Sequence, residues 1–296
     1  MPYFDKEKLN YYNKLNKERF GMSETILPYE ISKGCINKCL FCMAFSKLRI
    51  KRIEKVISEL TFLSKEYKSR WVFFTDNTIN ASIEYLEELC NCLIENKLEI
   101  QWYANARPQF SDVTLIKKMR RAGCRALVYG IESGSQTVLD RLGKGKISVK
   151  EMSRALKSGH NAGIVNFIFL IMNYIYESEE EFKQTIEFIE RNHKYIFSVA
   201  FMPFVLVNDS QLHSAPQKYG IEIIRQNSGL PFFLRSFDNL PFNETRGLKW
   251  LQRDEVQLRK EKILTNILKK HKIKSGLHLE PPFPLVAQEY HENYTN

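Results

Sequence analysis

Short apolar runs along this chain alternate with longer stretches in which apolar residues recur every three or four positions. The short runs predict buried strands, and the longer stretches predict amphipathic helices. The predicted strands cover residues 27–31, 71–75, 99–104, 125–130, 164–172 and 196–202. The predicted helices between them cover residues 82–95, 111–121, 148–161 and 178–193. Alternation of this kind is typical of parallel strands joined by right-handed crossovers.

Serine and glycine residues mark several of the predicted helix ends. Ser111 and Ser178 each stand where a side-chain oxygen can cap the first turn of a helix. Gly123 and Gly163 follow two helices and can adopt the left-handed conformation that often ends one. These residues set the limits of the predicted elements.

The alternation ends near residue 205, and this bounds the fold class. A complete eight-fold barrel typically takes about 250 residues, so we expect an α/β fold with a partial (β/α)6 TIM-like barrel and a C-terminal extension. Residues 1–24 are the expected N-terminal segment, residues 25–205 the barrel, and residues 206–296 an extension that covers the substrate side and the open edge. Within the extension, residues 208–218 predict a loop and residues 250–270 a long charged helix.

Composition places the chain among ordinary globular proteins. It has 296 residues, of which 44% are hydrophobic and 26% charged. No run approaches the roughly 20 apolar residues of a membrane span, and the first residues lack the apolar core of a secretory signal. We therefore expect a cytoplasmic protein with no membrane partner.

The net charge of +10 raises the question of an anionic partner such as a nucleic acid. The basic residues are spread among three separate stretches, near residues 47–55, 117–121 and 269–274. This distribution favours solvated helix faces over a nucleic-acid surface, and no nucleic-acid motif occurs.

Three of the six cysteines stand close together in the run from Gly34 to Cys42. They are Cys35, Cys39 and Cys42. A structural zinc or an ordinary iron–sulfur cluster takes four protein ligands, whereas this run offers three thiolates and leaves one metal position open. A zinc knuckle that borrows a ligand from elsewhere is the alternative. The other cysteines, Cys90, Cys92 and Cys124, are expected to be buried structural residues.

The spacing of three and then two residues between the cysteines, with Phe41 before the third, resembles the signature of radical S-adenosylmethionine (radical SAM) enzymes. The resemblance implies that Cys35, Cys39 and Cys42 ligate a 4Fe–4S cluster whose open iron binds S-adenosylmethionine. Further similar segments lie at residues 73–77, 102–107, 122–124, 129–135 and 143–144. With these segments, the resemblance is to the catalytic module of the cobalamin-associated and methylthiotransferase-like branch. It covers about residues 25–190.

Two absences distinguish the chain from that branch. Only 34 residues precede Cys35, and no Asp-x-His-x-x-Gly motif occurs, so we expect no cobalamin-binding domain. No cysteine follows Cys124, so one cluster is expected. The loops at residues 172–177 and 202–210 also depart from the family pattern, on the side that faces the substrate.

Polar residues that follow the predicted strands supply the remaining site. Asp76 and Asn77 can accept hydrogen bonds from the ammonium group of the cofactor, or form a helix-initiating Asx turn. Arg107 can pair with the methionine carboxylate or form a surface salt bridge. Glu132 can accept from the ribose hydroxyls, and Ser133 can donate to the cofactor or cap a helix. Together with Phe41 these are the predicted cofactor-binding residues.

The resemblance implies reductive cleavage of S-adenosylmethionine to a 5′-deoxyadenosyl radical, which abstracts hydrogen from a small metabolite or peptide. Epimerisation, rearrangement or oxidation can follow, as in natural product tailoring, and Cys92 or Cys124 could donate a hydrogen atom in an epimerisation. The expected partners are the substrate and an electron donor such as flavodoxin or ferredoxin. Alternatives are a methyltransferase that uses cobalamin from a partner subunit, tRNA or nucleotide modification, and a non-enzymatic zinc module.

Overall fold

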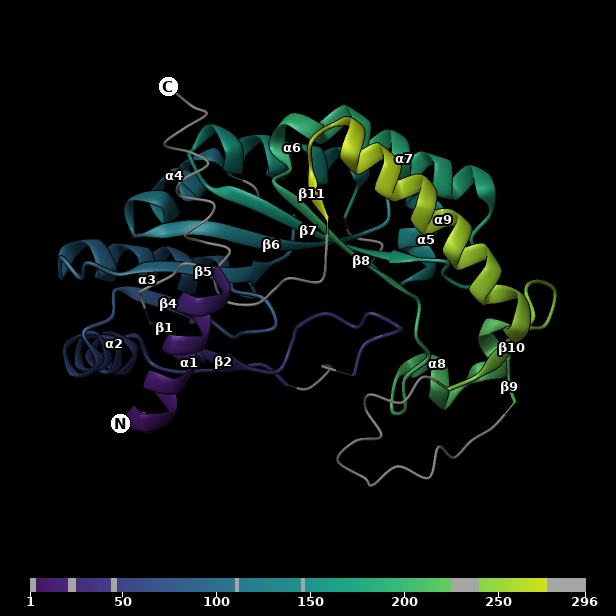
Figure 1. The fold of residues 1–296 in the computed structure, drawn as a ribbon. Helices are drawn as coiled ribbons and strands as arrows, with labels where there is room; N and C mark the ends of the chain where they lie inside the picture. Colours follow the sequence, from purple (N-terminus) through teal and green to yellow (C-terminus); the bar gives the residue numbers. More distant parts are fainter. Residues whose placement is uncertain are drawn as a thin grey trace.

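Seven parallel strands form one sheet whose spatial order follows the chain order (Figure 1). The computed structural model describes residues 4–20, 25–43, 47–109, 112–144, 147–224 and 240–275. The strands are β1 (Ile26–Tyr29), β4 (Trp71–Phe74), β5 (Gln101–Ala106), β6 (Cys124–Glu132), β7 (Val165–Met172), β8 (Ser198–Pro203) and β11 (Lys274–Ser275). Because each strand pairs with the one that follows it in this series, the sheet is an open, partial TIM-like barrel. The predicted fold class is confirmed.

Helices connect the strands and lie along the outer side of the curved sheet (Figure 1). They are α2 (Ile53–Tyr67), α3 (Ile83–Glu95), α4 (Val113–Arg121), α5 (Gln136–Arg141), α6 (Val149–Asn161), α7 (Glu179–Asn192) and α9 (Trp250–Lys270), and α1 (Lys6–Phe20) precedes β1. The sequence reading overlooked α2, although Val56, Leu60 and Leu63 recur at helical spacing and are buried. The long helix predicted over residues 250–270 is confirmed.

The helix limits follow the predicted capping chemistry. Ser178 accepts a hydrogen bond from the Glu181 backbone as the N-cap of α7, so this prediction is confirmed. Ser111 lies outside the described residues, and the N-cap of α4 is Asp112, whose carboxylate accepts from two backbone amides. Gly123 adopts φ +97°, and a Cβ there would lie 2.0 Å from the Ile100 carbonyl oxygen, so only glycine fits.

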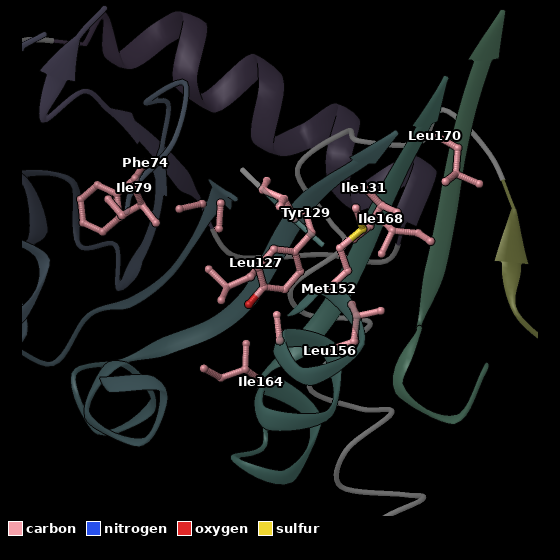
Figure 2. Close-up of a cluster of buried hydrophobic side chains, with 14 of the residues drawn as sticks. Phe74, Ile79, Leu127, Tyr129, Ile131, Met152, Leu156, Ile164, Ile168 and Leu170 are labelled. Atoms are coloured by element: carbon pink, nitrogen blue, oxygen red, sulfur yellow. The ribbon is translucent and has the colours of Figure 1, made fainter. Parts of the chain in front are cut away.

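The two faces of the sheet form separate cores. On β6, Leu127 and Tyr129 face the helices, whereas Val128 faces the interior of the barrel. Figure 2 shows Leu127 and Tyr129 packed near Met152 and Leu156 of α6. This period of two buries both faces of the central strands, as the apolar runs predicted.

The region after β8 is more ordered than the sequence suggested. The loop predicted over residues 208–218 is wrong, because the segment contains α8 (Gln211–Ser214) and the 3₁₀ helix η2 (Pro216–Tyr219). An antiparallel pair of β9 (Ile221–Ile223) and β10 (Phe242–Glu244) follows, and α9 then leads to β11. The β11 strand pairs in parallel with β8 and so extends the edge of the barrel.

Of the three cysteines outside the run, Cys90 and Cys124 are buried as predicted, whereas Cys92 is only partly buried. Cys90 and Cys124 are completely buried, and burial raises the pKa of the Cys90 thiol to about 12. Cys92 is half-buried on α3 and packs against the main core. In the part of the chain that the structure covers, no helix combines the length and apolar character needed to cross a bilayer.

Candidate active site

The cysteine run lies on a loop at the carboxyl end of β1. A short antiparallel pair, β2 (Ser32–Lys33) and β3 (Arg49–Ile50), joins the two ends of this loop. The Asn77 side-chain amide, which follows β4, donates to the Gly34 carbonyl at 3.1 Å. The Cys42 backbone amide donates to the Cys39 carbonyl at 3.1 Å, which makes a tight turn between these two cysteines. Local pairing thus presents all three thiols at the rim where barrel active sites gather.

A cavity of about 290 Å³ lies at this rim. Seven of the nine predicted site residues line it, namely Cys35, Cys39, Phe41, Cys42, Asn77, Arg107 and Glu132. Its other lining residues are Asn37, Thr78, Asn105, Ala106, Val128, Gly130, Lys144 and Phe169. Residues from the cysteine loop and from the ends of β4 to β7 therefore converge on one cavity.

Two of the thiols have nitrogen donors beside them. The Asn37 backbone and side-chain amides lie 3.5 Å and 3.4 Å from the Cys35 sulfur. The Arg107 guanidinium lies 3.6 Å from the Cys39 sulfur, and its Nε donates to the Gln109 side chain. Nitrogen donors at these positions can hydrogen-bond to a cysteine sulfur that also binds a metal, as groups beside metal ligands commonly do.

The donor set fits a cluster with three protein ligands. Three thiols line one cavity and lie within eight positions of sequence, and thiolates are the usual ligands of iron–sulfur clusters. Across the described ranges, no group of three or more His, Cys, Asp or Glu side chains is already arranged to hold a metal ion. The three thiols are therefore suitable ligands on one short loop, but they are not already grouped around a common metal position.

A buried ion pair forms another wall of the cavity. Lys144 donates from Nζ to Glu132 Oε1 at 2.7 Å and to the Gly130 carbonyl at 2.6 Å. Glu132 has φ +64°, which is unusual for a residue with a side chain and turns its carboxylate back towards the lysine. A Cβ on Gly130 would lie 2.6 Å from Glu132 Oε1, so a side chain there would displace the carboxylate.

Lys144 is the cavity residue whose role the sequence reading missed. Its side chain is only 5% exposed, and a lysine is rarely buried without a charge partner. The segment at residues 143–144 carried part of the family resemblance, so the signal was present. The sequence could not show that the chain after α5 turns back, so that Lys144 lies beside Gly130 and Glu132 at the end of β6.

Asp76 and Ser133 do not line the cavity, and the geometry favours structural roles for both. The Asp76 carboxylate accepts from the Ile31 amide at 3.0 Å, from the Ser32 amide at 2.6 Å and from the Ser32 hydroxyl. Burial raises the pKa of Asp76, although the hydrogen bonds from Ser32 and Ile31 act in the opposite direction. Ser133 contacts the Thr185 hydroxyl at 3.0 Å and accepts from the Ser135 amide at 3.1 Å. The predicted cofactor contacts of Asp76 and Ser133 therefore find no support in this arrangement.

Replacement of Asp76 by alanine is expected to destabilise the protein by about 3 kcal/mol, because three buried donors lose their acceptor. Chemical denaturation of the metal-free protein measures this change. Asn77→Ala is the control, since its side chain makes one exposed hydrogen bond to Gly34. If Asp76→Ala unfolds at the same denaturant concentration as the wild type, the structural role is wrong.

A larger hollow of about 500 Å³ lies at the opposite edge of the sheet. Lys97 and Arg121 line it at the carboxyl ends of α3 and α4, together with Arg70 and Arg125. Basic side chains at these positions offset the partial negative charge of the two helix ends. The hollow holds none of the predicted site residues.

Residues 29–189 match the model of the Radical SAM superfamily. This match covers more than half of the 296 residues and includes the cysteine loop, the cavity and strands β4 to β7. The chain therefore belongs to the radical SAM superfamily and is an enzyme.

Curated relatives include several proteins named as methyltransferases. The uncharacterized methyltransferase PH0819 of Pyrococcus horikoshii is 30% identical over 54% of this chain and 36% of its own length. Bacteriochlorophyllide d C-8(2)-methyltransferase of Chlorobaculum tepidum is 23% identical over 66% of this chain and 45% of its own length. The chain thus spans less than half the length of these relatives.

Solved structures with a similar fold include two cobalamin-dependent enzymes. TsrM of Kitasatospora setae, a radical S-adenosylmethionine methyltransferase solved with cobalamin and a [4Fe–4S] cluster, superposes with a TM-score of 0.63 and 14% identity, over 75% of this chain and 44% of TsrM. OxsB, solved with aqua-cobalamin and S-adenosylmethionine, gives a TM-score of 0.63 and 17% identity over 90% of this chain and 45% of OxsB. At these identities the likeness concerns the fold. A 4Fe–4S cluster and S-adenosylmethionine are the cofactors of the superfamily to which the chain belongs.

Proposed function

We propose that this chain cleaves S-adenosylmethionine reductively at the 290 Å³ cavity and abstracts a hydrogen atom from a small organic substrate or a peptide. The observation that carries this proposal is the convergence of three thiols, Arg107 and the Glu132–Lys144 pair on one cavity at the carboxyl ends of the strands. Residues 25–205 form the catalytic barrel in this proposal, and residues 206–296 cover its substrate side.

Each lining residue has a role that its chemistry suits. Cys35, Cys39 and Cys42 would hold the cluster. Arg107 would pair with the methionine carboxylate, because its guanidinium already lies beside Cys39. A cluster held there would supply the electron for reductive cleavage of S-adenosylmethionine to methionine and a 5′-deoxyadenosyl radical.

The other walls would orient and shield the nucleoside. Glu132 would accept from the ribose hydroxyls, with Lys144 fixing the direction of its carboxylate. Val128 and Phe169 give the cavity an apolar side that excludes water from the reacting atoms. Asn77 would donate or accept a hydrogen bond at the cofactor while it holds Gly34. The electron would come from a reduced flavodoxin or ferredoxin.

Methyl transfer is a second candidate, and the names of the relatives favour it. Four of the similar curated proteins are named as methyltransferases, including one for cytidylyl-2-hydroxyethylphosphonate from Streptomyces wedmorensis. The solved neighbours TsrM and OxsB are described with cobalamin bound. In this candidate, cobalamin would be supplied by a partner subunit, and the substrate would be a small organic molecule.

Anaerobic reconstitution tests the proposal and separates the two candidates. The protein is loaded with iron and sulfide, and S-adenosylmethionine and dithionite are added with and without hydroxocobalamin, whose reduced cobalt can accept a methyl group. We expect 5′-deoxyadenosine without added cobalamin. S-adenosylhomocysteine that forms only when cobalamin is added would instead favour methyl transfer. If a protein with an intact cluster forms neither product, the proposed chemistry is wrong.

A further inference from the structure

Helix α8, far from the cysteines in sequence, lies against the cysteine loop. The Leu212 backbone amide donates to the Leu40 carbonyl at 3.2 Å, and the Gln211 side-chain amide donates to the Lys38 carbonyl at 3.2 Å. The two acceptors flank Cys39 in the chain. The C-terminal extension therefore contacts the backbone that carries a predicted cluster ligand.

The same loop segment is held from its other side by the end of α5. The Leu40 amide donates to the Leu142 carbonyl at 3.0 Å. Gly143 follows at φ +74°, and a Cβ there would lie 3.1 Å from Leu40 Cγ and 3.2 Å from the Lys38 carbonyl oxygen. Both backbone polar groups of Leu40 are thus engaged, and little space remains for the loop to shift.

The position of α8 is itself well determined. Ser210 accepts from the His213 amide at 3.2 Å as the N-cap, and its hydroxyl donates to the Val207 carbonyl at 2.9 Å. Leu212 is 1% exposed and belongs to the main core. The Leu240 amide donates to the Leu206 carbonyl at 3.0 Å and so joins the segment before α8 to the strand that follows. A buried anchor therefore supports the two contacts with the loop.

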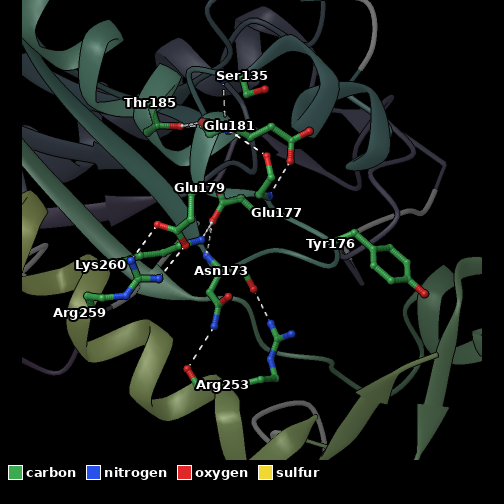
Figure 3. Close-up of polar contacts among 12 residues, drawn as sticks. Ser135, Asn173, Tyr176, Glu177, Glu179, Glu181, Thr185, Arg253, Arg259 and Lys260 are labelled. Atoms are coloured by element: carbon green, nitrogen blue, oxygen red, sulfur yellow. Dashed lines mark hydrogen bonds and ion pairs between the residues drawn. The ribbon is translucent and has the colours of Figure 1, made fainter. Parts of the chain in front are cut away.

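Buried charges fix the extension to the barrel (Figure 3). Lys260 of α9 pairs with Glu177 at 2.7 Å, and Arg253 pairs with Glu244 at 2.8 Å; all four side chains are at most 6% exposed. Arg253 also donates to the Asn173 carbonyl, in the loop that follows β7. The Lys260–Glu177 pair and the Arg253–Asn173 contact therefore join α9 of the extension to the loop after β7.

We propose that α8 is a positioning segment for the cysteine loop, in which Gln211 and the Leu212 amide hold residues 38–40 and thereby keep Cys39 and Cys42 in place around the cluster. The inference rests on the proposed assignment of these cysteines as ligands. Groups that orient metal ligands without touching the metal commonly affect how firmly the metal is held. The predicted consequence is slower loss of iron in the wild type than in variants that lack the Gln211 side chain or the buried Leu212 side chain, which anchors the Leu212 amide against the loop.

Iron release from the reconstituted protein tests this inference. Gln211→Ala and Leu212→Ala are loaded with the cluster anaerobically, and its loss to the chelator bathophenanthroline disulfonate is followed by absorbance. We expect release about tenfold faster for Leu212→Ala and about threefold faster for Gln211→Ala, in line with the usual effect of groups that support metal ligands. Ser214→Ala is the matched control, because Ser214 lies on α8 but donates only to the Ser210 carbonyl.

Thermal unfolding of the metal-free proteins separates positioning from general destabilisation. The hydrogen bond from Gln211 to the Lys38 carbonyl is exposed to solvent. Gln211→Ala should therefore unfold at the same temperature as the wild type and yet release iron faster. Wild-type release rates in both variants would overturn the inference. A cluster that is retained but forms no 5′-deoxyadenosine would count against the proposed function and leave the positioning role intact.

Discussion

Cys39→Ala is expected to reduce 5′-deoxyadenosine formation to the level of a control without enzyme. Cys39 is the most buried of the three predicted ligands and lies beside Arg107. Its loss would leave two thiols where a cluster needs at least three from this chain. Product formation with dithionite and S-adenosylmethionine, measured by chromatography, gives the effect directly, and iron content measured on the same sample shows whether the cluster is lost.

Cys92→Ala provides the comparison for Cys39→Ala. Cys92 is half-buried on α3 and does not line the cavity. This variant should retain the iron content and the product yield of the wild type. Equal product from the Cys39 and Cys92 variants would contradict the assignment of the cysteine loop as the cluster site.

Lys260→Met is expected to lower the free energy of unfolding by about 4 kcal/mol, because removal of one partner leaves the other charge buried and unpaired. Lys260 and Glu177 are 0% and 1% exposed, and their charged atoms are 2.7 Å apart. Burial already raises the pKa of Glu177, and Lys260 is the main influence that lowers it. Denaturant unfolding of the metal-free protein measures the loss.

An exposed ion pair at the other end of α9 offers the comparison. Lys270 of α9 pairs with Glu190 of α7 at 2.8 Å, with side chains 63% and 34% exposed. Lys270→Met should cost less than about 1 kcal/mol, as exposed ion pairs usually do. The double variant Glu177→Gln with Lys260→Met should recover part of the loss, because it removes the unpaired charge. Similar effects at the two lysines would show that burial does not determine the contribution of the pair.

Local signals were sufficient for six of the seven strands of the barrel sheet and for most of the residues at its rim. Apolar runs of strand length and helices with serine caps are properties of neighbouring residues, so the six strands could be read directly. Cys35, Cys39 and Cys42 stand in one short run, and Arg107 and Glu132 each follow or end a strand. Because parallel strands present their carboxyl ends at one edge, residues at these positions could be expected to meet.

Asp76 and Ser133 are the two predicted site residues that do not line the cavity. Both follow strands, as the rim residues do, yet Asp76 binds backbone amides of the chain after β1 and Ser133 contacts Thr185 of α7. The strand register and the direction of each side chain decide between cavity and interior, and neither is a property of the local sequence.

The amino-acid sequence by itself determined the class of enzyme, the order of the strands and the three thiols, because each depends on residues that lie close together in the chain. Only the tertiary structure decided that Lys144 pairs with Glu132, that α8 supports the cysteine loop and that buried charges join α9 to the loop after β7. These contacts link residues between 12 and 173 positions apart. Their energy depends on burial and distance, which arise only when the chain has folded.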